Sequence, residues 1–153
     1  MSQSTTVTAL QPIVKSIEVD RPLDEAFRMF TGEMAGWWPL ASHSVGGADA
    51  RWCGIEGRVG GRVFERTTAG EEHVWGTVTV WEPPRRVAFT WHPGQPSDPH
   101  TEVELRFAET AGGRTWIELE HRNWEAIGDR AGEVRQNYVG GWDFVLGEFA
   151  RTG

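Results

Sequence analysis

The sequence predicts an α+β protein in which a curved antiparallel sheet wraps around a long C-terminal helix, with two short helices after the first strand. Residues 74–91 alternate apolar and polar side chains on both sides of two consecutive prolines, which is typical of a hairpin, because proline cannot donate a ladder hydrogen bond. Residues 101–107 and 114–122 alternate too, with charged side chains on one half of each, so one face of the sheet is covered. An apolar stripe over 134–149 predicts a helix of about five turns that can cover that face.

The other expected elements precede the hairpin. A first strand is predicted over 13–19, and a helix follows from Pro22, because proline is tolerated in the first turn of a helix. A second short helix ends at Pro39. The glycine-rich residues 40–61, with room for a brief strand around 50–55, are typical of a functional rim or lid.

The totals limit the classes of function. At 153 residues the chain is long enough for one domain, which we expect over 11–153 after a flexible tail at 1–10. A net charge of −7 argues against nucleic acid as a partner. No apolar run reaches the roughly 18 residues of a membrane span, and the N-terminus lacks the features of a signal peptide. A single cysteine, Cys53, can form no internal disulfide and indicates the cytoplasm.

Seven segments carry a resemblance to a known family. They are KSIEVDRPLDEAFRMFT (15–31), WWPLASHSV (37–45), GGRVFER (60–66), WGTVTVWEPPRRVAFTW (75–91), TEVELRF (101–107), IELEHRNWE (117–125) and Gly141-Trp142. In this order they resemble the SRPBCC superfamily, which has the helix-grip fold of START-like and birch-pollen-allergen-like proteins. Within it the chain is similar to the bacterial branch related to the C-terminal domain of the activator of heat-shock protein 90 ATPase.

The resemblance covers residues 13–150 and implies an apolar cavity between the sheet and the last helix. Members of the superfamily bind lipids, hormones, polyketides or other hydrophobic molecules, and some are cyclases or hydrolases, so the fold alone does not determine the activity. Aromatic side chains that face such a cavity are suited to planar apolar ligands, although core packing is the alternative for each of them. The candidate ligand-binding residues are Trp37, Trp38, His43, Val78, Phe89, Trp91, Phe107, Leu119, His121, Tyr138 and Trp142.

Three polar residues are candidates for acid–base catalysis. His121 shares a predicted strand face with apolar residues, and the alternative to a catalytic role is a histidine satisfied by a backbone carbonyl. His43 is either a residue of the cavity mouth or an ordinary loop histidine. Glu65 faces inward only if Val63 does, and it lies on the surface if Phe64 is the inward residue.

Metal and cofactor chemistry have little support in the sequence. An inward Glu65 near Arg51 or His121 would form a site, because a buried carboxylate needs a partner. However, the residues His43, Cys53, Glu65 and His121 lack the close paired spacing of metal ligands. Neither a phosphate-binding glycine loop nor a nucleophile motif is present, and Cys53 fits a small packing residue. We therefore predict no metal and no cofactor.

Strand parity also predicts an outer tryptophan face. In strict alternation Trp75, Trp81 and Trp116 point away from the core, and three exposed tryptophans would form a patch suited to a homodimer.

Three hypotheses follow, in order of preference. The first is a protein that binds an apolar or aromatic small molecule, and the second is a polyketide-cyclase-like or hydrolase-like enzyme that uses the same cavity. The third is a chaperone partner, as the name of the resembling family suggests. Neither a nucleic acid nor a membrane is expected as a partner.

Overall fold

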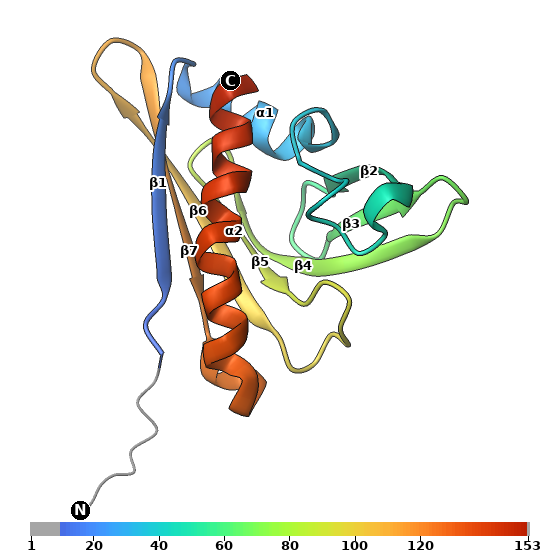
Figure 1. Ribbon diagram of the computed structural model, residues 1–153. Helices are drawn as coiled ribbons and strands as arrows, with labels where there is room; N and C mark the ends of the chain where they lie inside the picture. The colour runs from blue at the N-terminus through green and yellow to red at the C-terminus, as the bar shows by residue number, and fades with distance from the viewer. Residues whose placement is uncertain (1–9, 153) are drawn as a thin grey trace, which may run out of the picture.

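The computed structural model describes residues 10–152, in which a seven-stranded antiparallel sheet curls around a long C-terminal helix (Figure 1). The strands are Ile13–Val19 (β1), Ala50–Ile55 (β2), Arg62–Thr67 (β3), Glu72–Glu82 (β4), Arg86–Trp91 (β5), Thr101–Thr110 (β6) and Arg114–Arg122 (β7). The helical segments are Leu23–Gly32 (α1), Met34–Gly36 (η1), Gly47–Asp49 (η2), Trp124–Arg130 (η3) and Ala131–Thr152 (α2). The predicted fold class is therefore confirmed.

The strand order is β1-β7-β6-β5-β4-β3-β2, so the two ends of the sheet come from the first part of the chain. The predicted hairpin is present, because Glu82 pairs with Arg86 and Trp81 with Val87 across the proline turn. The predicted tail lies outside the described residues except for Leu10. Within residues 10–152, no helix is long and apolar enough to cross a membrane.

Two β-bulges in β4 overturn part of the predicted outer tryptophan face. The register shifts at Trp75, beside β3, and again at Thr79, beside β5. Each bulge adds one residue and moves the following side chains to the other face of the sheet. Trp75 is therefore only 1% exposed, and Trp81 packs edge-to-face on Phe27 with ring centroids 5.3 Å apart. The prediction that Trp75 and Trp81 point outward is wrong, and of the three only Trp116, 41% exposed, lies on the outer face.

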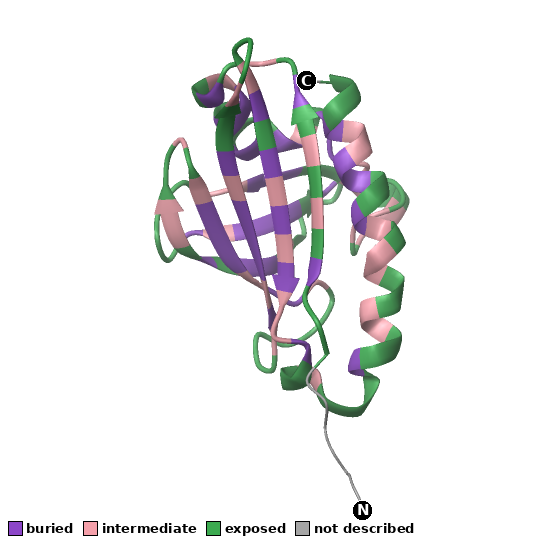
Figure 2. Ribbon diagram, turned by 90° about the vertical axis from the view of Figure 1, so that its left-hand side faces the viewer, coloured by how far each residue is buried: buried purple, intermediate pink, exposed green. Residues whose placement is uncertain are grey.

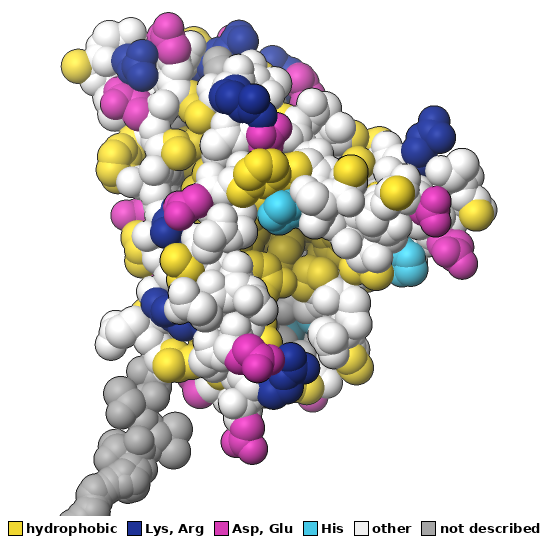
Figure 3. All heavy atoms as spheres, viewed as in Figure 1, with side chains coloured by type: hydrophobic (Ala, Val, Ile, Leu, Met, Phe, Trp, Pro, Cys, Tyr) yellow, Lys and Arg dark blue, Asp and Glu magenta, His cyan; other side chains and the backbone are white. Residues whose placement is uncertain are grey.

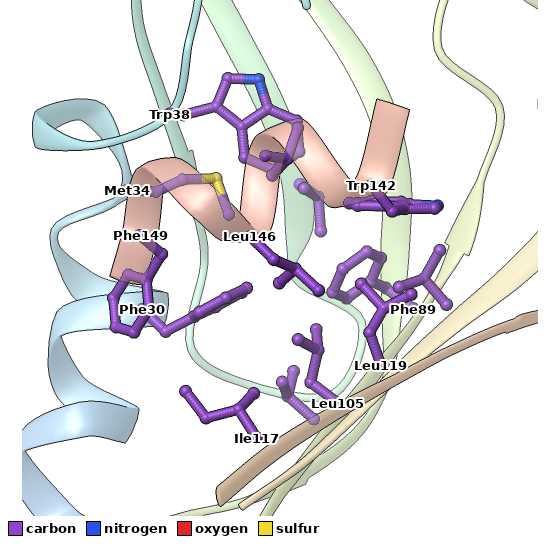
Figure 4. Packing of buried hydrophobic residues seen from close by; sticks show 14 of the residues in the cluster. Phe30, Met34, Trp38, Phe89, Leu105, Ile117, Leu119, Trp142, Leu146 and Phe149 are labelled. Atoms are coloured by element: carbon purple, nitrogen blue, oxygen red, sulfur yellow. The ribbon is translucent and has the colours of Figure 1, made fainter. Parts of the chain in front are cut away.

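The core lies under the C-terminal half of α2. Figure 4 shows Leu146 and Phe149 of this helix facing Leu105 and Ile117 of the sheet. The N-terminal half of α2 is mostly exposed or half-buried, as the green and pink lower turns of the helix in Figure 2 show. One end of the helix thus seals the core, and the other end leaves room above the sheet.

The outer face of the central strands carries a network of ion pairs. Glu104, only 2% exposed, accepts hydrogen bonds from Arg86, from Arg122 at 2.7 Å and from Arg106 at 3.2 Å. Arg106 also contacts Glu118 and Glu120 at 3.0 Å each. Charged side chains therefore occupy the face where the sequence predicted a tryptophan patch.

Candidate functional site

A cavity of about 340 Å³ lies between the sheet and the middle of α2. The hollow with a yellow, hydrophobic floor and a cyan histidine at its edge is visible on the face shown in Figure 3. Its size is within the range of about 300–1,000 Å³ that is usual for small-molecule sites. Its main lining residues are Trp38, His43, Trp75, Trp91, Tyr138 and Trp142.

Four tryptophans from four parts of the chain form a closed ring of contacts in this wall. Trp75 comes from β4, Trp91 from β5, Trp142 from α2, and Trp38 from the loop after η1. Going around the ring from Trp38, successive ring centroids are 5.1, 5.7, 5.4 and 6.1 Å apart. Such distances are typical of favourable aromatic pairs, so the ring is a rigid apolar surface.

The indole N–H groups of this ring are all engaged within the protein. A buried indole normally finds a hydrogen-bond partner, and these four find theirs in the protein's own acceptors. Trp38 donates to the carbonyl oxygen of His43 (2.8 Å), Trp75 to Glu65 Oε1 (2.7 Å), Trp91 to Tyr138 Oη (3.0 Å) and Trp142 to His121 Nδ1 (2.9 Å).

Glu65 is an inward, fully buried carboxylate that holds the rim of the cavity. Val63 also faces the core, which resolves the parity that the sequence left open. Besides the indole of Trp75, Glu65 accepts hydrogen bonds from the backbone N–H groups of Val45 (2.6 Å) and Gly46 (2.8 Å). A Cβ at residue 46 would lie only 3.0 Å from Glu65 Oε2, so glycine permits this close approach. The carboxylate thereby fixes the loop that carries His43.

His121 is buried, neutral and satisfied at both ring nitrogens. Its Nδ1 accepts the indole hydrogen of Trp142, so the ring proton lies on Nε2, 2.7 Å from Thr101 Oγ1. The Thr101 hydroxyl in turn donates to the carbonyl oxygen of Trp91 at 3.2 Å. Burial lowers the pKa of His121 from 6.5 to about 3. Side-chain groups therefore satisfy this histidine, in place of the backbone carbonyl that the sequence suggested as the alternative.

His43 is the one member of the candidate catalytic trio that lines the cavity. Its Nδ1 lies 2.7 Å from Ser42 Oγ, and its ring stacks on Phe144 of α2 at 5.0 Å and 17°. This stack joins the rim loop to the helix across the cavity mouth. Within residues 10–152, no hydrogen bond joins any two of Glu65, His121 and His43.

The other predicted ligand-binding residues belong to the core and do not line this cavity. Trp37 packs on Phe30 and Phe149, and its N–H donates to the carbonyl oxygen of Met29 at 3.2 Å. The remaining members of this group are Val78, Phe89, Phe107 and Leu119.

Cys53 is 1% exposed, and burial raises the pKa of its thiol to about 12. In the described part of the chain, no three His, Cys, Asp or Glu side chains come together as a possible metal site. The absence of a metal and of a cofactor stays a prediction.

Sequence reasoning missed Trp75 as a cavity residue. The available signal was Gly76, because a glycine inside a strand often marks a bulge or a close backbone approach. A Cβ at this position would lie 1.7 Å from the carbonyl oxygen of Thr90, so only glycine fits.

A second cavity, of about 490 Å³, shares part of its wall with the first. Trp91, Pro93 and Tyr138 line both cavities. The far side of the second cavity is lined by residues that include Gln95, Pro96, Pro99, Trp124 and Val134. The hydrogen-bonded pair of Trp91 and Tyr138 thus lies between the two cavities.

Comparison with known structures gives the same fold. A synthase described as "anthrahydroquino-γ-pyrone synthase Txn09 complexed with SUM" is 28% identical, with a TM-score of 0.62 over 94% of this chain and 97% of that one. The protein MLL2253 from Mesorhizobium loti is 16% identical, with a TM-score of 0.67 over 92% and 95% of the two chains. The Aha1 dimer from Colwellia psychrerythraea is 19% identical, with a TM-score of 0.63 over 92% and 94%. A search of curated protein sequences finds no significant match.

A family model matches residues 20–152, from the end of β1 to the last residue of α2. The match therefore includes the strands, the rim loop and the helix that together form the cavity. The chain belongs to the family of activator of Hsp90 ATPase homolog 1-like proteins.

Proposed function

We propose that the protein binds a planar, apolar or aromatic small molecule in the cavity under the middle of α2. The observation that carries this proposal is the cluster of Trp38, Trp75, Trp91 and Trp142, whose rings contact one another and form an apolar wall of a space of about 340 Å³. Flat indole surfaces favour flat ligands through stacking and apolar burial. The cytoplasm stays the expected location, because the single cysteine can form no internal disulfide.

Two neighbouring glycines of α2 provide a matched test. Gly141 lines the cavity, whereas Gly140 does not and is exposed, and a Cβ at either position would meet no atom within 4 Å. Both Gly141→Leu and Gly140→Leu should stabilise the helix by about 0.5–1 kcal/mol, since leucine has a higher helix propensity than glycine. Only Gly141→Leu adds a side chain to the wall of the cavity.

The binding measurement is a thermal-shift screen of planar tricyclic aromatics and fatty acids, read with tryptophan fluorescence. A ligand of the folded state raises the midpoint by mass action. We expect tricyclic aromatics to shift the wild type and Gly140→Leu alike, and to bind Gly141→Leu at least about tenfold more weakly, because the added side chain crowds the ligand. Equal shifts in both variants, or no shift in the wild type with any compound, would contradict the proposal.

An enzyme of the cyclase or synthase type is the second candidate. It is favoured by the 28% identity to a protein described as an anthrahydroquino-γ-pyrone synthase. Glu65 and His121 are fully buried and hydrogen-bonded elsewhere, so His43 at the rim would have to act as the acid or base. Conversion of a bound aromatic polyketide that is lost in His43→Gln, while binding is retained, would favour this candidate.

A chaperone partner, suggested by the family name, is the third candidate, because the cavity has no evident part in such a function. A homodimer also stays a proposal. Trp75 and Trp81 pack inside the protein, so the outer tryptophan face predicted for a dimer contact is not formed.

A further inference from the structure

Few polar side-chain groups on the wall of the first cavity remain able to recognise a ligand. The four indole N–H groups are engaged, and Ser44 donates to the carbonyl oxygen of Leu40 and accepts from Gly47. Ser42 pairs with Nδ1 of His43. What is left is the hydroxyl hydrogen of Tyr138 and, at the open rim where water competes, the polar atom that the Ser42–His43 pair leaves free in either tautomer of His43.

The Tyr138 hydroxyl has an incomplete set of hydrogen bonds. Its oxygen accepts the indole hydrogen of Trp91 at 3.0 Å, but among residues 10–152 no group accepts the hydroxyl hydrogen. Because the Tyr138 oxygen accepts a hydrogen bond from Trp91, the O–H bond of Tyr138 is polarised and its hydrogen becomes a better donor. Burial raises the pKa of Tyr138, so the hydroxyl keeps its proton at neutral pH.

The charge of the wall limits what this donor can meet. No Lys, Arg, Asp or Glu is among the residues that line the first cavity. An anionic ligand such as a carboxylate would therefore be buried without a counter-charge, which is unfavourable. A neutral acceptor that is rigidly attached to a flat ring system, such as an aromatic carbonyl oxygen, fits both the aromatic wall and the Tyr138 hydroxyl.

We propose that the Tyr138 hydroxyl is the specificity-determining donor of the cavity and that the ligand is a neutral planar aromatic ketone or quinone, whose carbonyl oxygen accepts this hydrogen bond. The inference rests on the proposed function, because it names the ligand class of the same cavity. Tyr138 lies on the wall shared with the second cavity, so the carbonyl end of the ligand lies against that wall.

The test compares fluorenone with fluorene, two flat tricyclic compounds that differ by C=O in place of CH₂. Equilibrium dialysis gives the affinity of each for the wild type and for Tyr138→Phe, which keeps the ring. The wild type should bind fluorenone about tenfold more tightly than fluorene, which is the value of roughly one hydrogen bond. In Tyr138→Phe the affinity for fluorenone should fall to that for fluorene, while the affinity for fluorene stays unchanged.

A spectroscopic readout separates this role from simple packing. Tyr138 is the only tyrosine of the chain, so protein labelled with 3-fluorotyrosine gives one fluorine resonance. Fluorenone should shift this resonance more than fluorene does at equal saturation. The inference would be overturned, and the proposed function would remain, in two cases. One is equal affinity of the wild type for both compounds, and the other is an equal loss of affinity for fluorenone and fluorene in Tyr138→Phe. Binding of neither compound would overturn both.

Discussion

The two faces of the sheet keep buried carboxylates in opposite ways. On the inner face, Glu65 is fully buried and is held by neutral donors, namely two backbone N–H groups and an indole. On the outer face, Glu104 is almost as buried but is held by arginines that are themselves about one-third exposed. The inner face thus depends on hydrogen-bond geometry, and the outer face depends on charge.

This difference has a functional meaning. Hydrogen bonds from fixed neutral groups shape the rim and the wall of the cavity and are insensitive to salt, whereas partly exposed ion pairs are screened by it. His121 follows the same rule on the inner face, since it is kept neutral and bonded to neutral partners. No Lys, Arg, Asp or Glu side chain lines the cavity itself, and the carboxylate of Glu65 is not among its lining residues.

The largest effect is expected from Glu65→Gln. The amide supplies one acceptor oxygen and places an NH₂ group against an N–H donor, so at least one hydrogen bond at the rim is lost and a donor–donor conflict is created. We expect the free energy of unfolding to fall by about 3 kcal/mol, as is usual for lost hydrogen bonds to a charged group. Urea unfolding at 0.05 M and 1 M NaCl should give the same loss.

Glu104→Gln is the matched control on the outer face. The released arginines can turn toward water, so the loss should be smaller, about 1–2 kcal/mol, and most of it should disappear at 1 M NaCl. A loss of unfolding free energy that depends on salt in Glu65→Gln but not in Glu104→Gln would contradict this contrast between the two faces.

The next effect is a loss of stability in acid that originates from His121. The pKa of His121 is about 3 in the folded protein and 6.5 in the unfolded chain. As the pH falls below 6.5, the unfolded chain therefore binds a proton at this histidine, whereas the folded protein does not. Stability should therefore decrease by about 1.4 kcal/mol per pH unit between pH 6.5 and 3. Thermal unfolding from pH 7 to 4.5 measures this slope.

The control for this slope is His121→Leu, which is less stable but should have a flatter profile of stability against pH between pH 6.5 and 4.5. An unchanged slope in His121→Leu would show that another group titrates in this range.

The carboxyl of Glu104 affects stability at lower pH than His121 does. Burial raises the pKa of Glu104, but hydrogen bonds from Arg86 and Arg122 outweigh burial and lower the pKa from 4.5. The stability that ionised Glu104 contributes to the folded protein is therefore present above pH 4.5 and is lost as the pH falls below it.

The smallest effect is expected from Trp116→Thr on the outer face. This side chain is 41% exposed and lacks the two tryptophan neighbours that the sequence suggested. The free energy of unfolding should change by no more than about 0.5 kcal/mol. The mass in solution, measured by light scattering, should be the same as that of the wild type. A change of oligomeric state would restore a role for this face in assembly.

Local patterns predicted the fold well because each strand and helix has its own periodicity. The strand at 114–122 is predicted with its correct ends, and the hairpin across the two prolines is predicted over 74–91, although its first strand begins at Glu72. The facing of Trp75 could not be predicted, since two bulges in β4 reset the alternation. The facing of Glu65 was open because the adjacent Val63 and Phe64 are both apolar and both buried. A bulge depends on the partner strand, which periodicity within one strand does not contain.

The candidate site was predicted less well for a related reason. Aromatic residues could be assigned to the interior, but the division into wall and core depends on where α2 lies over the sheet. Trp91 and Tyr138 are 47 residues apart, and only the folded chain brings the indole N–H to the hydroxyl. The tautomer of His121 likewise follows from Trp142, which is 21 residues away.

The uneven packing of α2 implies that its two halves differ in how readily they open. Its buried residues other than Ala131 lie between Trp142 and Phe149, whereas Gly140 and Gly141 precede them with no neighbouring side chain to hold them. Backbone amides after residue 142 should exchange with deuterium only when the whole protein unfolds, and those before residue 140 should exchange through local fraying. Fraying that reaches Tyr138 would break its hydrogen bond with Trp91 and open the wall of the cavity. A ligand can therefore enter from the start of the helix while the core beneath its end stays folded.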